Sequence, residues 1–252
     1  MQITLKGVSD LIPNNNEWLS RTELLLGKDK LALLKSKNVL VVGLGGVGAY
    51  AAENICRAGV GRMTIVDGDE VIETNINRQL IAMHNTIGKS KAKIMEERLL
   101  SINPEIKLHT INKYIYEYEM KNLVTNEFDY IVDAIDTLSP KFQLILASLN
   151  KEIPIVSSMG AGTKSDPSKV LVSDISKSYN CNLARVLRKK LYRHNIRHGI
   201  KVVFSSELTA HEAIVPEEGQ NKKSVVGTIS YMPPVFGCFC ASVVIRDLLN
   251  LQ

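Results

Sequence analysis

The chain of 252 residues has little cysteine, few aromatic residues and no long apolar run, and each shortage narrows its class. Its four cysteines show no disulfide-framework spacing, which favours a reducing compartment. The longest apolar run covers only residues 235–245, too short to span a bilayer, and it predicts a buried core helix. The N-terminus shows no basic-then-apolar leader pattern. We therefore expect a cytoplasmic protein with no membrane partner.

The composition is that of a globular protein, with 45% apolar and 23% charged residues and a net charge of +5. Apolar runs alternate with helical stretches in the first 160 residues, which predicts a doubly wound, Rossmann-like, mostly parallel α/β sheet. The runs are Val39–Val42, Met63–Val66, Ile106–Ile111, Tyr130–Val132 and Ile153–Val156. After residue 162 the pattern loosens. We expect one domain over 1–252, with a nucleotide-binding core at about 20–160 and an appended β-rich and basic helical part at about 161–252.

A glycine-rich turn follows the first apolar run in VVGLGGVGAY. Gly43, Gly45 and Gly48 satisfy G-x-G-x-x-G, and Gly46 adds a fourth glycine. Such glycines permit a tight turn and let the backbone approach phosphates at a helix N-terminus. Asp67 ends the next apolar run, at the spacing of a carboxylate that accepts hydrogen bonds from ribose hydroxyls. The unit predicts a bound nucleotide without distinguishing NAD from ATP.

Cationic and acidic residues after this unit favour ATP. Asn75 and Arg78 follow the acid, Lys91 stands at an expected helix start, and Asp136 follows another predicted strand. Cations that converge on phosphates, with a carboxylate able to hold magnesium, suit phosphate-transfer chemistry. A hydride-transfer enzyme leaves the pyrophosphate intact and needs no such clamp. Taken singly, each residue has a plainer alternative: a solvated loop, an exposed helix face or a helix cap.

The chain resembles the ubiquitin-activating-enzyme superfamily, and within it the ThiF/MoeB-like enzymes that adenylate sulfur-carrier proteins. The resemblance covers nearly the whole chain and rests on RTELLLG, GLGGVG, VDGDEVIETNINRQ, IGKSKAK, INPE and DAIDT. It implies carboxylate adenylation, in which a carboxylate oxygen attacks the α-phosphorus of ATP and pyrophosphate leaves.

The same resemblance implies a role for each matching residue. Arg78 and Lys91 are implied to hold the triphosphate, and Asp136 is implied to hold Mg²⁺. Arg21 matches an arginine that crosses a dimer interface into the ATP site of the neighbouring subunit. The resemblance therefore implies a homodimer, with Arg21 as the fourth catalytic residue beside Arg78, Lys91 and Asp136. The implied ATP-binding residues are Gly43, Gly45, Gly46, Gly48, Asp67, Asn75, Arg78, Lys91, Asp136 and Thr137.

Sulfur-carrier activators of this fold usually carry two C-x-x-C pairs that bind zinc. The nearest pattern here is Cys238-Phe239-Cys240, with one intervening residue, so no zinc is expected. Cys56, Cys238 and Cys240 are predicted to be small buried apolar residues. Cys181 precedes an arginine-rich helix, and a role for it stays open.

The most distinctive stretch is KSYNCNLARVLRKKLYRHNIRHGIK. It holds eight Lys or Arg between Lys177 and Lys201 and no acid, and no acid occurs between Asp174 and Glu207. Leu183, Val186 or Leu187, and Leu191 form an apolar stripe on the predicted helix. A one-sided basic helix beside an ATP site is typical of polyanion binding, whereas a merely solvated face usually mixes signs. The predicted RNA-binding residues are Arg185, Arg188, Lys189, Lys190, Arg193 and Arg197.

This combination is similar to the tRNA threonylcarbamoyladenosine dehydratase family. The matching motifs lie in both halves: SRTELLLGK, FDYIVDAIDT, IPIVSSMGAGTKSDPSKVLVSDISKS, CNLARVLRKKL, KVVFSSE and GTISYMPPVFG. The family implies ATP-dependent cyclisation of N6-threonylcarbamoyladenosine next to the tRNA anticodon. The base's own carboxylate is adenylated and its carbamoyl group displaces AMP, so no catalytic cysteine is needed. One departure is the short loop 208–226, where relatives often carry a longer cysteine-containing insertion.

Three other readings stay open at this point. An activator of a ubiquitin-like sulfur-carrier protein would use the same adenylation chemistry with a protein C-terminus. A nicotinamide-dependent oxidoreductase would use the glycines and Asp67 but leave Arg78, Lys91 and Asp136 without a role. A non-catalytic tRNA- or nucleotide-binding module would tolerate loss of Asp136. The family resemblance implies tRNA as the partner and leaves a sulfur-transfer protein partner undecided.

Overall fold

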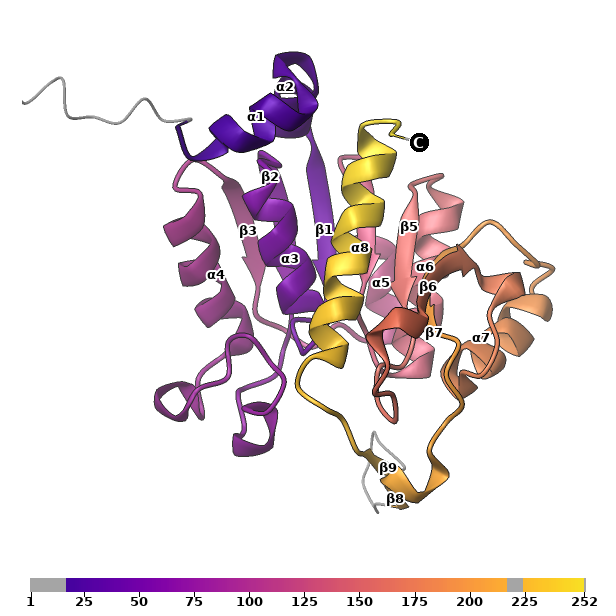
Figure 1. The fold of residues 1–252 in the computed structure, drawn as a ribbon. Helices are drawn as coiled ribbons and strands as arrows, with labels where there is room; N and C mark the ends of the chain where they lie inside the picture. The colour runs from indigo at the N-terminus through magenta and orange to yellow at the C-terminus, as the bar shows by residue number, and fades with distance from the viewer. Residues whose placement is uncertain (1–16, 217–223, 252) are drawn as a thin grey trace, which may run out of the picture.

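The fold is given by a computed structural model that describes residues 17–216 and 224–251. Its centre is a seven-stranded sheet with the strand order β3-β2-β1-β4-β5-β7-β6 (Figure 1). The strands of this sheet are β1 (Asn38–Val42), β2 (Arg62–Val66), β3 (Lys107–Ile111), β4 (Tyr130–Asp133), β5 (Ile155–Ser158), β6 (Val170–Asp174) and β7 (Lys201–Ser205). Every pairing is parallel except that of β6 with β7. The predicted mostly parallel α/β sheet is confirmed, and its first five strands overlap the five apolar runs.

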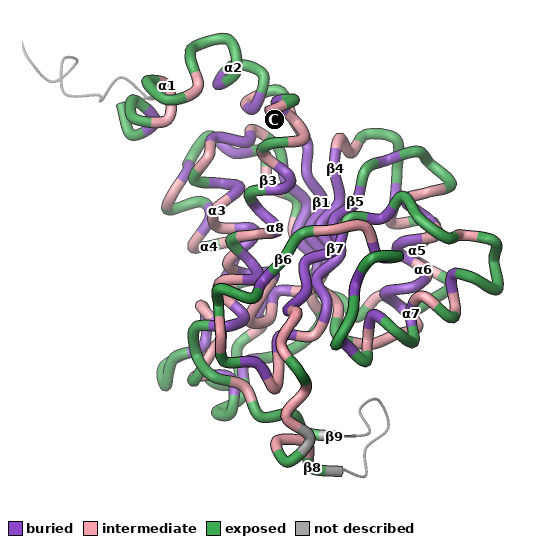
Figure 2. The backbone as a smooth tube through the Cα atoms, turned by 45° about the vertical axis from the view of Figure 1, so that its right-hand side comes forward, coloured by how far each residue is buried: buried purple, intermediate pink, exposed green. Residues whose placement is uncertain are grey.

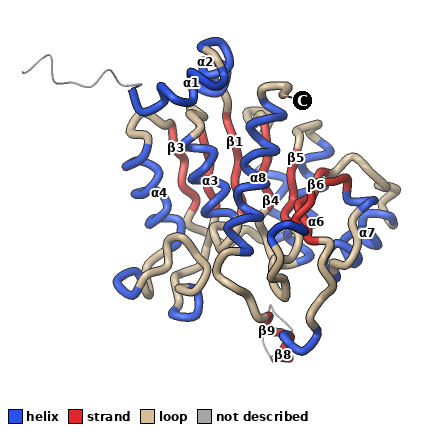
Figure 3. Tube along the Cα trace, viewed as in Figure 1, coloured by secondary structure: helices blue, strands red, loops and turns tan. Residues whose placement is uncertain are grey.

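Helices cover both faces of the sheet (Figure 3). Their bounds are α1 (Ser20–Leu26), α2 (Lys28–Ser36), α3 (Gly48–Arg57), α4 (Lys91–Ile102), α5 (Met120–Leu123), α6 (Leu138–Asn150), α7 (Asn182–Tyr192) and α8 (Met232–Leu248). All five residues of β1 are buried, as expected of a central parallel strand. Its side chains alternate between two cores: Val39 and Val41 pack with α3, α4 and α8, and Leu40 and Val42 pack with α5, α6 and α7. Figure 2 shows this buried sheet between half-exposed helices.

The residues after 160 join the same sheet. Strand β7 pairs with β5, β6 adds an antiparallel edge, and α8 returns to pack tightly against α3. Here a Cβ on Gly237 would lie 2.8 Å from the Cβ of Tyr50, so glycine permits the close approach of the two helices. The predicted buried helix at 235–245 is confirmed as the centre of α8. Strands β8 (Ile214–Pro216) and β9 (Ser224–Val226) pair as a small two-stranded sheet within the loop 208–226. Residues 217–223 of that loop lie outside the described residues.

One cysteine prediction is wrong. Cys56 and Cys240 are buried as expected, but Cys238 is exposed. Cys240 and Phe236 point into the core from α8, and Cys238 lies two residues from each, which turns it to the other side of the helix. There its sulfur accepts a long hydrogen bond of 3.7 Å from Asn54 Nδ2.

Among the described helices, no segment is both long and apolar enough to cross a membrane.

The two ends of the sheet differ in what they carry. The loops that follow β1, β2, β4 and β5 all leave from the carboxyl edge, at the bottom of Figure 1. Helices α1 and α2 lie at the opposite, amino edge, where β1 begins. Ligands of open α/β sheets bind at the carboxyl edge, so the fold assigns the candidate site to these loops.

A fully buried ion pair fastens one of these loops. The Nζ atom of Lys141 in α6 lies 2.7 Å from Asp133 Oδ2 at the end of β4, and both side chains are fully buried. Lys141 also donates to Ser157 Oγ at 3.0 Å and to the Ser158 carbonyl at 2.9 Å, which ties α6 to β5. The other carboxylate oxygen, Asp133 Oδ1, accepts from the Ile135 N–H at 3.1 Å. The ion pair therefore helps to fix the backbone conformation of residues 133–135, just before Asp136.

We expect Lys141→Met to lower the free energy of unfolding by about 3–5 kcal/mol, because it leaves the buried Asp133 carboxylate without its cation. Urea unfolding followed by circular dichroism measures the change. The matched control is Lys201→Met, because the Lys201 side chain is 50% exposed and its ammonium pairs with Asp247, which is 28% exposed. Its loss should cost less than about 1 kcal/mol. Equal losses in the two variants would show that the buried pair contributes no more than a surface pair.

Candidate functional site

The glycine turn between β1 and α3 forms the floor of the site. Gly43 has φ of 91°, and a Cβ there would lie 2.8 Å from the Ala134 carbonyl oxygen in the loop after β4. A Cβ on Gly48 would overlap the Gly43 carbonyl, and one on Gly46 would lie 2.9 Å from Pro233 Cβ. The fold itself therefore requires glycine at these three positions.

Gly45 differs from the other three glycines. A Cβ there would meet only Gln79 Nε2, at 3.7 Å, which is ordinary van der Waals contact. Packing therefore does not explain a glycine at this position, whereas a ligand that approaches the backbone would. Helix α3 begins just beyond, and no side chain among the described residues accepts a hydrogen bond at its N-terminal cap, Val47. Its first N–H groups are suited to an anion.

Asp67 directly follows β2 and contacts the glycine turn. Its Oδ2 accepts from the Leu44 N–H at 2.6 Å, and its Oδ1 accepts from the Asp69 N–H at 2.8 Å. Burial raises the pKa of Asp67 above that of an ordinary carboxyl group, and the nearby Lys91 ammonium and these two N–H groups offset only part of the rise. The carboxylate thus stands beside the turn, where the ribose was predicted.

Lys91 is the first residue of α4 and is only 6% exposed. Its Nζ lies 2.9 Å from Asp69 Oδ2, and its backbone N–H donates to the Asp69 carbonyl at 3.0 Å. The Asp69 side chain is 64% exposed, so this pair sits at the rim of the site. A phosphate is a stronger partner for the ammonium than a hydrated carboxylate, and this arrangement leaves the cation pre-positioned.

The loop 72–79 brings Asn75 and Arg78 to the same turn. Asn75 is buried, and its Oδ1 accepts from the Ile72 N–H at 3.3 Å. The Arg78 carbonyl oxygen lies 3.3 Å from the Cβ position of Gly46. Its guanidinium Nη1 donates to the Thr74 carbonyl at 2.8 Å and to Asn77 Oδ1 at 2.9 Å, which orients the side chain along this loop.

Sequence reasoning missed Gln79, the neighbour of Arg78. Its side chain is 9% exposed, and its Oε1 is one of two buried side-chain atoms that lack a hydrogen-bond partner among the described residues. Its Nε2 faces Gly45. A buried polar atom without a partner costs free energy, so its place against the glycine turn is best explained by a ligand. The only available signal was its position directly after Arg78 in NINRQ.

Asp136 and Thr137 lie in the loop between β4 and α6. Asp136 is exposed at the carboxyl edge, and Thr137 is the N-terminal cap residue of α6. The backbone of Ala134 in the same loop touches Gly43, and Asp133 just before it is held by the buried Lys141. The predicted magnesium ligand is therefore carried by a loop that packs on the glycine turn.

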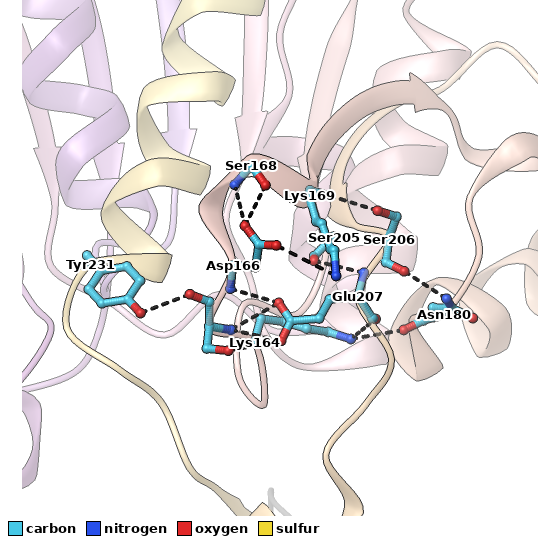
Figure 4. A network of polar contacts seen from close by, with 10 residues as sticks. Lys164, Asp166, Ser168, Lys169, Asn180, Ser205, Ser206, Glu207 and Tyr231 are labelled. Atoms are coloured by element: carbon cyan, nitrogen blue, oxygen red, sulfur yellow. Dashed lines mark hydrogen bonds and ion pairs between the residues drawn. The ribbon is translucent and has the colours of Figure 1, made fainter.

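A further loop, residues 159–169 after β5, borders the site and was not predicted. Figure 4 shows the Glu207 carboxylate clamping this loop: it accepts from the N–H groups of Ser165 at 3.0 Å and Asp166 at 2.9 Å. Partial burial raises the pKa of Glu207, but these hydrogen bonds outweigh it and hold that pKa below its ordinary value. Tyr231, just before α8, donates to the Ser165 carbonyl at 2.8 Å. This side of the site is therefore fixed in place.

Arg21 lies far from these loops in its own chain. It is an exposed residue of α1, at the amino edge of the sheet, whereas the glycine turn is at the carboxyl edge (Figure 1). A role for Arg21 at an ATP site is therefore possible only in a second copy. The neighbouring Leu24 and Leu25 are 87% and 84% exposed, an apolar surface that a partner would cover.

Fewer cations are exposed on and just after helix α7 than the sequence predicted. Arg185, Lys189, Arg193 and Arg197 are exposed as expected. Arg188 is half-buried instead, because its Nη1 donates to the Ser178 carbonyl at 2.8 Å and to the Ser178 hydroxyl. Lys190 lies toward α6, with its Nζ 3.3 Å from Ser139 Oγ and 4.5 Å from the centre of the Phe142 ring. Arg188 thus serves the fold, and Lys190 reaches the first turn of α6, next to Asp136.

Comparison with known proteins identifies the family of this chain. The model of the ThiF family matches residues 19–252. The tRNA threonylcarbamoyladenosine dehydratase of Bacillus subtilis is 37% identical over 239 residues, 92% of this chain and 94% of that protein. The structure of Escherichia coli tRNA N6-threonylcarbamoyladenosine dehydratase, TcdA, in complex with ATP matches with a TM-score of 0.85 and 30% identity, over 93% of this chain and 95% of that chain. The molybdopterin-synthase adenylyltransferase of Escherichia coli is 30% identical over 59% of each chain. The chain belongs to the ThiF family.

Proposed function

We propose that this chain is an ATP-dependent tRNA threonylcarbamoyladenosine dehydratase. The observation that carries the proposal is the convergence of Asp67, Arg78 and Asp136 on one glycine turn, through loops that touch its backbone. The relatives that share this fold over more than nine-tenths of both chains bear that name, and one of them was solved with ATP.

The site fits ATP at each of its parts. The open backbone at Gly45 and the N-terminus of α3 offer N–H groups to the phosphates, and Lys91 and Arg78 supply positive charge. Asp67 accepts from the ribose hydroxyls, and Gln79 supplies the polar atom that lacks a partner among the described residues. We assign Asn75 to the α-phosphate because the family resemblance implies this role and its side chain is buried in the loop that also carries Arg78.

Asp136 is the residue that would hold Mg²⁺, with Thr137 beside it. Mg²⁺ is usually bound through one or two carboxylates together with substrate phosphates and water. The described residues contain no group of three or more His, Cys, Asp or Glu side chains close enough to hold a metal, and this mode of binding needs none. When bound, the ion would neutralise charge on the phosphates.

The reaction proceeds in two steps at this edge of the sheet. A carboxylate oxygen of the modified base attacks the α-phosphorus, and the bond to pyrophosphate breaks. The carbamoyl group on the same side chain then attacks the acyl-adenylate, which closes the ring and releases AMP, so the base loses one water overall. Arg78 and Lys91 stabilise the charge that develops on the phosphates. The nucleophile is intramolecular and already adjacent, so no side-chain nucleophile is required.

The tRNA would approach over α7. Arg185, Lys189 and Arg193 are spaced by four residues and form one exposed row, while Leu187 and Leu191 on the other side are buried. Lys190 links this helix to Ser139 at the start of α6. Phosphates bound along the row would therefore lead toward Asp136. A cytoplasmic homodimer, in which Arg21 completes the site of its partner, is part of the same proposal.

Two alternative activities are separated by simple tests. An activator of a sulfur-carrier protein would exchange pyrophosphate into ATP in response to a protein C-terminus, and not in response to modified tRNA. A nicotinamide-dependent oxidoreductase would bind NADH. Association with a sulfur-transfer protein would be detected by co-purification and does not alter the expected tRNA product.

Mass spectrometry of tRNA nucleosides tests the function directly. After incubation of tRNA containing N6-threonylcarbamoyladenosine with the protein, ATP and Mg²⁺, we expect a nucleoside lighter by one water. Asp136→Asn should slow its formation by on the order of 100-fold or more, because charge on the phosphates is no longer neutralised. Glu97→Gln, an exposed acid on α4, is the matched control and should retain activity. Absence of the lighter nucleoside with wild-type protein would refute the function.

Mixing two inactive variants tests the contribution of Arg21 across a dimer. Arg21→Ala and Lys91→Ala are each expected to lack activity, because each removes a cation from both sites of its own dimer. Hybrid dimers keep one intact site, so refolding the two together should restore up to about a quarter of wild-type turnover. Turnover that stays at the level of the separate variants would place Arg21 outside the neighbouring site.

Charge removal from α7 tests the RNA-binding face. The triple variant Arg185→Gln, Lys189→Gln, Arg193→Gln should weaken tRNA binding and reduce the slope of log affinity against log salt by up to about 3, while ATP binding is retained. Arg188 is left intact because it supports the fold. The control removes three exposed lysines from the amino edge: Lys30, Lys107 and Lys151. An equal effect of both triple variants would show that only net charge matters.

A further inference from the structure

Three exposed tyrosines form a ladder between β3 and α5. Tyr114 and Tyr116 are in edge-to-face contact, with ring centres 5.1 Å apart, and Tyr116 and Tyr118 are parallel at 5.9 Å with an interplanar angle of 3°. Their exposed fractions are 41%, 53% and 71% in chain order. Ile115 between them packs on the core. The alternation directs one apolar side chain inward and three aromatic rings into solvent.

The chain that carries the ladder is held in one conformation. The Glu119 carboxylate accepts from the Tyr116 N–H at 3.0 Å and pairs with the Lys113 ammonium. The backbone of Tyr114 packs so closely against Gly68 that a side chain there would overlap it. Exposed rings on an ordered segment lose little entropy when a ligand binds them, so this surface is suited to binding. The three tyrosine rings are exposed and do not belong to the buried core.

The ladder borders the candidate site on the side opposite the basic helix. Gly68 directly follows Asp67, so Tyr114 stands next to the predicted ribose position. The 3-10 helix Glu117–Glu119, which contains Tyr118, and α5 after it both contact α6, and α6 contacts α7. Neighbouring helices pack about 8–10 Å apart, which separates the ladder from α7 by roughly 20 Å. The start of α6, just after Asp136, lies between them.

We propose that this tyrosine ladder is a stacking platform for unpaired bases of the RNA substrate. The proposal rests on the proposed function and extends it to the part of the RNA that carries no paired partner. Aromatic side chains stack on any base, and proteins that bind single-stranded RNA combine such rings with a separate cationic surface. Here Lys113 is neutralised by Glu119, so the ladder offers stacking, while the row on α7 offers charge for the phosphates.

Two RNA probes and two sets of variants test the platform. The probes are a hairpin with an unpaired loop and a blunt duplex of the same length, and binding is measured by fluorescence anisotropy. The variant Tyr116→Leu, Tyr118→Leu should bind the hairpin on the order of tenfold more weakly, because Leu keeps apolar bulk but cannot stack. Its affinity for the duplex should be unchanged, because paired bases are already stacked. Tyr116→Phe, Tyr118→Phe is the matched control and should bind the hairpin as the wild type does.

Three results would overturn the proposal: unchanged hairpin binding by the Leu variant, equal losses for hairpin and duplex, or an equal loss in the Phe variant. An unchanged thermal midpoint and unchanged ATP binding confirm that the Leu variant is folded. The binding assay is independent of turnover. Wild-type protein that cyclises the base while the Leu variant binds normally would refute the ladder alone. Wild-type protein that shows the ladder effect without cyclisation would refute the function alone.

Discussion

The site depends on how tightly the backbone closes between β1 and α3. At Gly48 a Cβ would overlap the Gly43 carbonyl, and at Gly43 it would press on Ala134 of the loop after β4. The Leu44 N–H in the same turn donates to Asp67 after β2. One short turn thus fixes the ends of three neighbouring strands against one another. Without this close packing of the turn, the functional groups on the separate loops would not be held in position to bind one ligand.

Much of the fold could be predicted from the sequence because parallel strands buried on both faces appear as continuous apolar runs. The glycine turn and Asp67 could also be predicted, because their contacts lie within one strand-helix-strand unit. Gln79 and the pair of Lys141 with Asp133 could not, since their meaning comes from neighbours that only the folded chain brings together. A lysine in an amphipathic helix gives no local sign that it will be fully buried.

Helix α7 shows the limit of periodicity as a guide to function. The 3.6-residue repeat located the apolar stripe but left Val186 and Leu187 as alternatives, and the structure buries Leu187. The sequence also predicted Arg188 as one of six RNA-binding cations, although its guanidinium donates to the carbonyl of Ser178 in the preceding segment. A charged side chain that caps backbone carbonyls inside its own protein has less to offer a ligand. The number of cations in a run therefore overstates the charge available to RNA.

The rigidity of the carboxyl edge has a consequence for the substrate. On one side the loop after β5 is clamped by Glu207 and Tyr231, and on the other the tyrosine ladder is ordered by Glu119. Neither border needs to move to expose Asp136, which already lies at the surface. A base held within a helix could not reach such a fixed site, so the conformational change falls on the RNA. A modified base in an unpaired loop meets that requirement at the lowest cost, since little stacking has to be lost.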